Sequence, residues 1–173
     1  MIRVGIGYDL HRLAPGRKLF LGGLEIPHSR GLVGHSDGDA LVHALIDAIL
    51  GATGEADIGR LFPDTDPTYA GIRSTELLRR VMAGLKKKKL RVLQADCVVV
   101  AERPKLGPCF PAMKDILCPI LGIPGDRLGL KAKTNEGLGF VGRGRAVACW
   151  AVALIDEGSR NQRTRKGTAA GSS

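Results

Sequence analysis

The sequence contains ten consecutive apolar residues, 146–155, and this run restricts the possible folds more than any other feature. It has about half of the ~20 residues that a helix needs to cross a bilayer, so no insertion into a membrane is expected. We predict instead that residues 145–155 form a strand, because an unbroken apolar run puts apolar side chains on both faces of a sheet. In a chain of only 173 residues, we expect one of these faces to be covered by another subunit.

The other periodic segments complete a fold of mixed class. Strands are expected at 2–8, 91–100 and 128–133, and as a pair over 18–26 that Gly22 and Gly23 interrupt. Helices are expected at 36–51, 74–89 and 111–121. The loose alternation of strands and helices, with one hairpin, fits an α/β or α+β sandwich. We predict the α+β class, as a single-domain sheet-and-helix sandwich over residues 1–156.

The charge is strongly positive, with 26 Lys and Arg against 17 Asp and Glu, a formal net charge of +9. Part of the excess lies in residues 86–91, and part in residues 158–173, which hold four basic and no acidic side chains. Such a balance fits nucleic acid, anionic lipid or a phosphorylated small substrate. Neither basic segment has interleaved aromatic residues to stack on bases, so no nucleic-acid partner is expected. Residues 157–173 are predicted to be a basic, disordered tail.

The cysteines and the beginning of the chain indicate a cytoplasmic protein. The four cysteines are spaced by 12, 9 and 31 residues and form no CxxC pair, so a cysteine zinc site is not expected. Free thiols in a reducing compartment are the expected state of Cys97, Cys109, Cys118 and Cys149. The first twenty residues contain no apolar stretch long enough for a signal peptide.

Three side chains are candidate metal ligands. If the first strand continues past residue 8, Asp9 and His11 point to the same side of it. His43 lies on the predicted helix 36–51 among apolar neighbours, and Asp47 follows one turn later. Two imidazoles and a carboxylate leave the fourth position of a tetrahedral ion open, as catalytic zinc sites require. Asp47 is expected to hold the other nitrogen of His43. Spacing alone leaves a purely structural role for these histidines open.

The segment before that helix, residues 34–39, has two possible roles: phosphate binding and capping of the helix. Free backbone N–H groups at a helix N-terminus favour a phosphate, but Asp37 and Asp39 would repel one. Ser36 has the spacing of a capping-box residue with Asp39, and acids are favourable at this end of the helix dipole. A structural cap therefore accounts for this segment except for His35.

Two loops have the composition of ligand-binding loops. Residues 57–67 contain two prolines and three aspartates, which fit an ordered loop with Asx turns. Residues 131–145 contain four glycines, and such a loop can wrap a diphosphate and hold magnesium through Glu136. The pattern is neither a Walker A nor a GxGxxG dinucleotide motif, so the glycines alone do not identify the ligand.

Taken in order, five segments resemble one enzyme family closely. They are GYDLH at 7–11, GHSDGDALVHALIDAILGA at 34–52, DIGRLFPDTDP at 57–67, ERPKL at 102–106 and KTNEGLGFVGRG at 133–144. This order and spacing resemble the 2-C-methyl-D-erythritol 2,4-cyclodiphosphate synthase family of the non-mevalonate isoprenoid pathway. The resemblance extends from residue 1 to about residue 155.

The resemblance implies a specific reaction and assembly. Members convert 4-diphosphocytidyl-2-C-methyl-D-erythritol 2-phosphate into the cyclic diphosphate, because the substrate's own 2-phosphate attacks the β-phosphorus and CMP leaves. It implies a homotrimer of α+β subunits with active sites between neighbouring subunits, and Zn²⁺ together with Mg²⁺ or Mn²⁺ as cofactors.

The resemblance also assigns roles to residues of this chain. Asp9, His11 and His43 would ligate zinc, Glu136 would contact magnesium or manganese, and His35 and Thr134 would stabilise the transition state. The implied substrate-binding residues are Asp9, Leu10, His11, His35, Ser36, Asp57, Ile58, Gly59, Phe62, Pro63, Asp64, Thr65, Asp66, Ala101, Glu102, Arg103, Pro104, Lys105, Leu106, Gly107, Lys133, Thr134, Asn135, Glu136, Phe140 and Arg143.

The chain departs from the family pattern at three positions. Lys133 stands where threonine is common, Arg145 where an acid is frequent, and Trp150 where some members have glutamate. Trp150 argues against binding of an isoprenoid diphosphate in the central cavity of a trimer. Two other functions remain as alternatives: a zinc-dependent phosphohydrolase that uses the same three ligands with water, and a basic nucleic-acid-binding protein.

Overall fold

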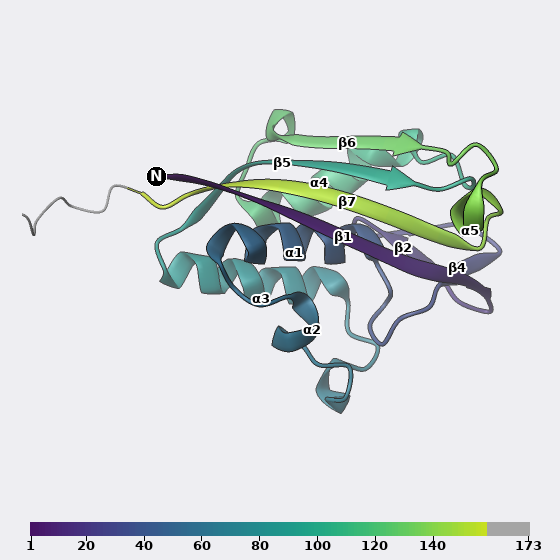
Figure 1. Cartoon of the computed structure of the whole chain (residues 1–173), viewed down its shortest axis with the longest axis horizontal. Coiled ribbons are helices and arrows are strands. Elements are labelled where there is room, and N and C mark those ends of the chain that lie inside the picture. Colours follow the sequence, from purple (N-terminus) through teal and green to yellow (C-terminus); the bar gives the residue numbers. More distant parts are fainter. Residues whose placement is uncertain (159–173) are drawn as a thin grey trace, which may run out of the picture.

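A five-stranded sheet is the central element of the fold in the computed structural model, which describes residues 1–158 (Figure 1). Its strand order is β4-β1-β7-β5-β6. β1 pairs antiparallel with β4 and β7, and β5 pairs antiparallel with β7 and parallel with β6. The strands are β1 (Ile2–Pro15), β4 (Arg30–Leu32), β5 (Arg91–Val100), β6 (Leu128–Lys133) and β7 (Ala146–Asp156), and a separate hairpin consists of β2 (Leu19–Leu21) and β3 (Leu24–Ile26).

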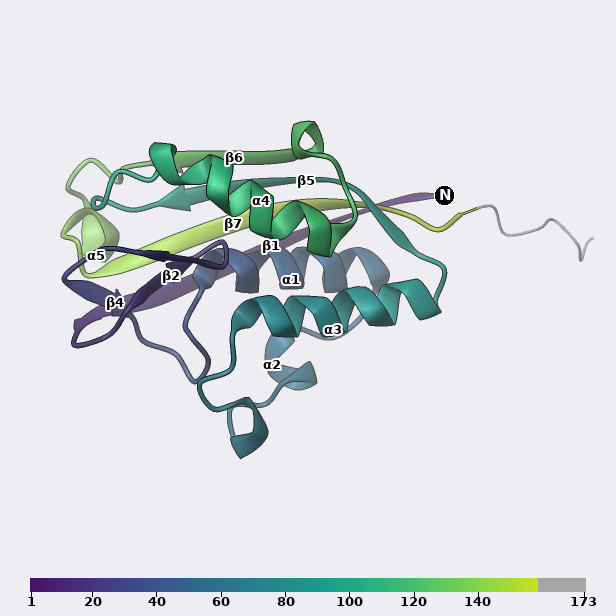
Figure 2. The same ribbon diagram turned by 180° about the vertical axis from the view of Figure 1, so that it is seen from behind.

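Three helices of twelve or more residues cover one face of this sheet (Figures 1 and 2). They are α1 (Ala40–Thr53), α3 (Ser74–Lys87) and α4 (Phe110–Leu121). α1 packs directly on β1 and β7, and α3 packs on α1 and α4. The shorter helices are α2 (Ile58–Leu61), α5 (Gly139–Gly142) and the 3-10 turns η1 (Pro67–Tyr69), η2 (Gly107–Cys109) and η3 (Gly125–Arg127). The α+β class and the sandwich of sheet and helices are confirmed.

Two glycines in β1 allow α1 to lie unusually close to the sheet. A Cβ atom on Gly7 would stand 1.9 Å from the carbonyl oxygen of Ala44, and one on Gly5 would stand 2.1 Å from that of Ala48. Contacts this short are impossible for a real Cβ, so only glycine fits at either position. Because alternate residues of a strand share a face, Asp9 and His11 follow these glycines on the side that α1 covers.

On the opposite face of the sheet, β1 and β7 carry an apolar patch that is exposed in the single chain. We call this patch the open face, and its seven side chains are between 40% and 70% exposed: Ile2, Val4, Ile6, Tyr8, Leu10, Trp150 and Val152. Tyr8 and Trp150 are partners across the β1–β7 ladder, with ring centroids 4.9 Å apart. β7 is thus an apolar strand as predicted, but one of its faces has no cover within residues 1–158.

The helix boundaries differ from the sequence prediction at one informative place. α1 begins at Ala40 and not at residue 36, and its N-cap is Asp39, which accepts a hydrogen bond from the Val42 N–H at 3.1 Å. The same carboxylate accepts the N–H groups of Gly22 and Gly23 in the β2–β3 turn. The prediction of a Ser36 cap was therefore wrong, since a fully buried Asp39 links the helix start to the hairpin.

The remaining expectations concern thiols and membranes. All four cysteines are free; Cys97 and Cys149 are buried, whereas Cys109 and Cys118 are half-buried. Burial raises the pKa of the Cys97 thiol to about 12. Within residues 1–158 the structure has no helix with the length and apolar character that crossing a bilayer requires. The predicted tail falls, from residue 159 onward, outside the described residues.

Candidate active site

Asp9, His11 and His43 converge on one point between β1 and α1. Asp9 Oδ2 lies 2.8 Å from His11 Nε2 and 3.0 Å from His43 Nδ1. The two imidazole nitrogens are 3.2 Å apart. The first strand was expected at residues 2–8, but β1 extends to Pro15, so Asp9 and His11 do share a side of it. α1 lies close to β1 at Gly5 and Gly7 and brings His43 beside this pair. We call these three residues the triad.

The separations within the triad fit a tetrahedral ion. Ligand atoms that stand 2.0–2.1 Å from a tetrahedral zinc are roughly 3.3 Å from one another. The three measured distances of 2.8, 3.0 and 3.2 Å are close to that value. The three residues also form a set whose ligand atoms all lie within 4.8 Å of one another. A divalent cation can therefore be held here with little movement of the side chains, and a fourth position stays open for a ligand.

Backbone contacts orient two of the three ligands. The second oxygen of Asp9 accepts the Leu10 N–H at 2.9 Å, which turns Oδ2 toward the imidazoles. His11 Nδ1 lies 2.5 Å from the Val33 carbonyl oxygen. A carbonyl only accepts, so Nδ1 carries the proton, and Nε2 offers its lone pair to the triad centre. These two hydrogen bonds orient Asp9 and His11 for metal binding in the absence of the metal, as the hydrogen-bond partners of metal ligands commonly do.

Charge also favours the ionised carboxylate in the triad. Burial alone would raise the pKa of Asp9, but hydrogen bonds from His11 and His43, and the charge of these rings, bring that pKa far below its ordinary value. Burial would lower the pKa of His11, yet its hydrogen bond to Asp9 and the charge of that carboxylate raise it above the ordinary value. Asp9 and His11 therefore stabilise each other's charged form. A cation bound by the triad would take the place of the positive charge of the His11 ring.

The role expected for Asp47 is wrong. Its Oδ1 accepts the Ile58 N–H at 2.8 Å and so holds the start of α2 against α1. His43 Nε2, which Asp47 was expected to contact, lies 2.8 Å from Ser74 Oγ and 3.1 Å from Ser36 Oγ. Residues i and i+4 share a stripe of a helix, but the ring of His43 points toward the start of α3 instead.

A hollow of about 400 Å³ opens beside the triad, and we call it the triad hollow. It combines His11 and His43 with members of both polar segments that the sequence singled out. Its lining is His11, Gly34, His35, Ser36, His43, Ile58, Gly59, Phe62, Asp64, Tyr69 and Leu77. Tyr69 and Leu77 were not predicted; Tyr69 packs edge-on against Phe62 at 5.3 Å between ring centroids, and the sequence shows no pattern that selects it.

The other residues of the 57–66 loop continue the same wall. Asp57 caps α2 by accepting the Arg60 N–H at 2.9 Å, and Asp66 accepts the Thr68 N–H at 2.9 Å. The backbone oxygen of Asp66 lies 3.2 Å from His35 Nε2, so this loop contacts the predicted catalytic histidine. Pro63 and Thr65 lie between these anchors, and an Asx turn of the expected kind is present at Asp66.

A second group of predicted residues gathers at the far ends of β5 and β6. These strands are parallel, so the segments that follow them, 101–107 and 133–143, leave the sheet at the same edge. Glu102 Oε1 accepts the Asn135 N–H at 2.8 Å and thereby joins the two segments. None of their residues lines the triad hollow. The predicted site residues thus form two groups in one chain.

The side chains in this second group differ in exposure. Glu102 and Pro104 are half-buried, and Ala101 and Leu106 are buried in the core. The exposed members are Arg103, Lys105, Gly107, Lys133, Thr134, Asn135, Glu136, Phe140 and Arg143, and Arg145 at the end of the loop is exposed as well. Leu10, from the first group, points to the open face, away from the triad.

Glu136 has an unusual backbone for the residue expected to meet a second cation. Its φ is +50°, which non-glycine residues rarely adopt. Its Oε1 accepts a hydrogen bond from Thr134 Oγ1 at 2.5 Å. Thr134, which the resemblance assigns to the transition state, and Glu136, which it assigns to the second cation, therefore contact each other on an exposed loop.

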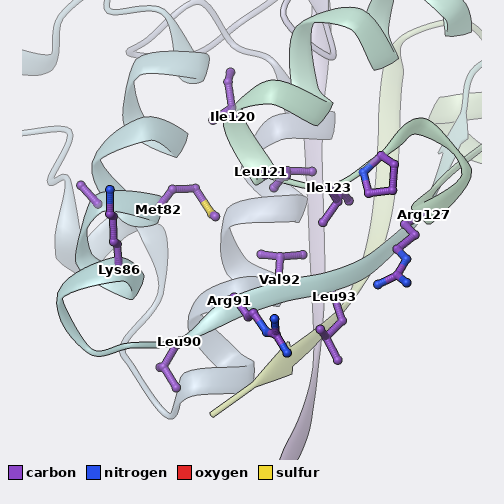
Figure 3. A pocket seen from close by; sticks show the side chains of 13 residues that line it. Met82, Lys86, Leu90, Arg91, Val92, Leu93, Ile120, Leu121, Ile123 and Arg127 are labelled. Atoms are coloured by element: carbon purple, nitrogen blue, oxygen red, sulfur yellow. The ribbon is translucent and has the colours of Figure 1, made fainter. Parts of the chain in front are cut away.

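A different hollow of about 410 Å³, the distal hollow, lies between the end of α3, the start of β5 and the end of α4 (Figure 3). Its wall is mainly apolar, with Leu90, Val92 and Ile123 among its residues, and Lys86, Arg91 and Arg127 bring positive charge. Ser74 begins α3 near the triad and Lys86 lies twelve residues later, about 18 Å along the helix axis. None of the sequence-predicted site residues lines the distal hollow.

Comparison with known proteins gives a consistent result. The model of the YgbB family matches residues 2–156. A 2-C-methyl-D-erythritol 2,4-cyclodiphosphate synthase of Syntrophus aciditrophicus is 55% identical over 156 residues, which are 90% of this chain and 98% of the relative. The enzyme of that name from Symbiobacterium thermophilum is 55% identical over 152 residues, 88% of this chain and 97% of the relative.

Solved structures agree with these relatives. A 2C-methyl-D-erythritol-2,4-cyclodiphosphate synthase with CDP bound superposes with a TM-score of 0.82 at 48% identity, covering 89% of this chain and all of that one. A CDP complex of IspF from Plasmodium falciparum gives a TM-score of 0.78 at 34% identity, with 89% and 95% of the two chains covered. The similarity thus includes the whole domain.

Proposed function

The chain belongs to the YgbB family, and on that premise we propose that it closes 4-diphosphocytidyl-2-C-methyl-D-erythritol 2-phosphate into 2-C-methyl-D-erythritol 2,4-cyclodiphosphate and releases CMP. This is the reaction of a phosphorus–oxygen lyase in isoprenoid precursor biosynthesis. The observation that carries the proposal is the convergence of Asp9, His11 and His43 beside a hollow that residues 34–36 and 58–64 line.

The chemistry requires positioning more than an external nucleophile. The attacking oxygen belongs to the substrate's own 2-phosphate, so the protein must bring two anionic groups together and hold them in line. At an effective dielectric of ~20, two unit charges 4 Å apart repel by about 4 kcal/mol. Neutralising that repulsion is the main task of the site.

Metal binding meets this requirement. Zn²⁺ on Asp9 Oδ2, His11 Nε2 and His43 Nδ1 would supply a Lewis acid and a template for phosphate oxygens. The chain holds its three ligand atoms on β1 and α1, two rigid elements, with separations that suit such an ion. Glu136 is the proposed ligand of Mg²⁺ or Mn²⁺.

His35 and Thr134 are the proposed stabilisers of charge on the phosphorus under attack. His35 lines the triad hollow, and its Nε2 is held by the Asp66 carbonyl. A carbonyl accepts only, so Nε2 carries a proton, and His35 would stabilise a phosphate oxygen by donating an N–H from Nδ1 as well. Residues 57–59 and 62–66 would hold the methylerythritol part, residues 101–107 the cytidine, and Lys133 adds positive charge beside the diphosphate.

The assembly belongs to the same proposal: a homotrimer with active sites between subunits. Two observations support it. The open face presents seven apolar side chains that are 40–70% exposed, a patch typical of a protein interface. Residues 101–107 and 133–143 also do not line the triad hollow of their own chain, so a neighbouring chain is needed to bring both groups together.

Three further parts of the proposal concern the chain as a whole. Residues 1–156 are the proposed catalytic domain, with residues 157–173 as a basic tail outside it. The proposed location is the cytoplasm, and neither a membrane nor a nucleic acid is a proposed partner.

Product analysis tests this function. The full chain is loaded with Zn²⁺ and Mg²⁺ and given the cytidylylated substrate, and its products are followed by ³¹P NMR. We expect one equivalent of CMP and one of the cyclic diphosphate. Simple hydrolysis to an open-chain phosphate would instead assign the triad to a zinc-dependent phosphohydrolase, and no reaction with either metal would contradict both.

A further inference from the structure

The Asp37 carboxylate has no task in the proposed reaction, yet it is only 9% exposed. It belongs to the loop before α1, and its backbone N–H donates to the Ile72 carbonyl at 3.0 Å, which ties this loop to the start of α3. Its Oδ1 accepts a hydrogen bond from the Ser74 hydroxyl. Ser74 is itself fully buried, so water does not compete for that bond.

The Ser74 hydroxyl has its other contact with the triad. Ser74 Oγ lies 2.8 Å from His43 Nε2, on the side of the ring opposite to the triad centre. His43 Nδ1 is the nitrogen that faces Asp9 and His11, at 3.0 and 3.2 Å. Ser74 thus stands between a metal ligand and a buried carboxylate that are otherwise unconnected.

The protons of this chain of contacts have one consistent arrangement. To offer a lone pair from Nδ1, the neutral imidazole of His43 must carry its proton on Nε2. That N–H donates to Ser74 Oγ, and the single hydroxyl proton of Ser74 donates to the Asp37 carboxylate, which can only accept. Each group thereby fixes the orientation of the next.

Arg73 secures the far end of the arrangement. Its Nε lies 3.2 Å from Asp37 Oδ2, an oxygen that accepts no hydrogen bond among the described residues. The positive charge lies beside a carboxylate that would be costly to bury without a partner. Ser36 Oγ also lies near His43, at 3.1 Å from Nε2, but of these two hydroxyls only that of Ser74 donates to a carboxylate, that of Asp37.

We propose that Ser74 and Asp37 are positioning residues that fix His43 in the tautomer with a free Nδ1 and so strengthen the binding of a divalent cation by the triad. The inference rests on the metal site of the proposed function. Such partners of a ligating histidine commonly change metal affinity by about 10–100-fold. Asp37 in the segment 34–39 then has a role that neither phosphate binding nor helix capping provides.

The test compares zinc affinity in full-length variants. Ser74→Ala removes the link and suits the first turn of a helix, and Asp37→Asn leaves a weaker, uncharged acceptor. Thr75→Ala is the matched control, because Thr75 is a buried neighbour on α3 that makes no side-chain hydrogen bond to the triad. Zinc Kd is measured by competition with a chromophoric chelator, without any turnover.

We expect Ser74→Ala to raise the zinc Kd by about 10–100-fold and Asp37→Asn to raise it less. The double variant should be no worse than Ser74→Ala, because Asp37 acts through Ser74 and the two effects then do not add. Thr75→Ala should stay within about threefold of the native chain. A Kd that is unchanged in Ser74→Ala, or raised equally in Thr75→Ala, would overturn the proposal.

A second readout separates positioning from packing. The tautomer of His43 is read from its ring ¹⁵N shifts in the metal-free protein at about pH 8.5, above the ordinary imidazole pKa of ~6.5. Ser74 favours the proton on Nε2 and the Asp9 carboxylate favours it on Nδ1, so the native chain should show a larger share of the Nε2-protonated ring than Ser74→Ala does. An equal share in the two proteins would contradict the inference alone, whereas a native chain without zinc affinity would remove the metal site as well.

Discussion

The triad hollow and the distal hollow are almost equal in size, about 400 and 410 Å³, but they differ in what their walls bring together. The triad hollow combines two imidazoles, a third histidine and Asp64 from three separate segments. The distal hollow has mainly apolar walls with three cations, of which Arg91 is already paired with Asp156 at 2.8 Å. The volume of a hollow therefore does not identify the active site of this chain; the convergence of metal-binding and polar groups does.

The largest effect is expected from His43→Ala, which removes a ligand from the triad. Loss of zinc should cost turnover about 10³-fold, since about 4 kcal/mol of charge stabilisation corresponds to that factor. Metal analysis of the purified variant and its rate of CMP release check this. Lys86→Ala, in the distal hollow, is the control and should keep both zinc and rate. Full zinc content in His43→Ala would contradict the assignment of the metal site to the triad hollow.

Next in size is the effect of a charge on the open face. Ile6 is 70% exposed in the single chain, and Ile6→Asp would place a carboxylate in the proposed subunit interface. We expect the mass measured by light scattering to fall from three chains to one, and activity to fall with it, because the triad hollow loses its second group of residues. Ala83→Asp adds the same charge beside the distal hollow and should leave the mass at three chains. An Ile6→Asp variant that stays trimeric would refute this interface.

A smaller effect is expected where α1 lies against β1. The Cβ of Gly7→Ala would meet the Ala44 carbonyl oxygen at 1.9 Å, so α1 must shift, at a cost of about 1–3 kcal/mol in the free energy of unfolding. Gly84→Ala, on α3 near the distal hollow, meets nothing within 4 Å and should raise that free energy by about 0.5–1 kcal/mol. Urea unfolding of both variants measures the difference. Equal free energies of unfolding for Gly7→Ala and Gly84→Ala would mean that the close contact between β1 and α1 is not needed to position His43.

The smallest of these effects is expected for Lys105→Ala. This exposed side chain belongs to the proposed cytidine pocket, which a neighbouring subunit would bring to the triad hollow. Loss of one charge-assisted hydrogen bond, about 1.5 kcal/mol, should raise KM roughly tenfold and leave kcat nearly unchanged. Steady-state kinetics with the cytidylylated substrate give both constants. An unaltered KM would show that Lys105 does not belong to the cytidine pocket.

The sequence was sufficient to predict that the three triad residues converge, because they belong to elements with clear periodicity. Asp9 and His11 share a face of β1 by strand alternation, and His43 is a polar residue on an apolar helix. The position of Asp47 on the same helical stripe also led to the wrong partner, because spacing does not show where a ring points. Ser74 is 31 residues from His43, and no pattern in the sequence connects them.

The start of α1 shows the same limit. Ser36 and Asp39 both have the chemistry of an N-cap, and the sequence does not show that the β2–β3 turn presents two further N–H groups to Asp39. That contact between distant segments decides which residue caps the helix. Likewise, the apolar run of β7 predicted a strand with two apolar faces, and the structure shows that Trp150 and Val152 on one of them are exposed in the single chain.

Anomalous X-ray scattering at the zinc edge, from crystals of the full chain grown with Zn²⁺, tests the central claim most directly. The account predicts a zinc peak about 2.0–2.1 Å from Asp9 Oδ2, His11 Nε2 and His43 Nδ1, with its fourth position turned toward the triad hollow. A triad without zinc under these conditions, or zinc held only by other side chains, would contradict it.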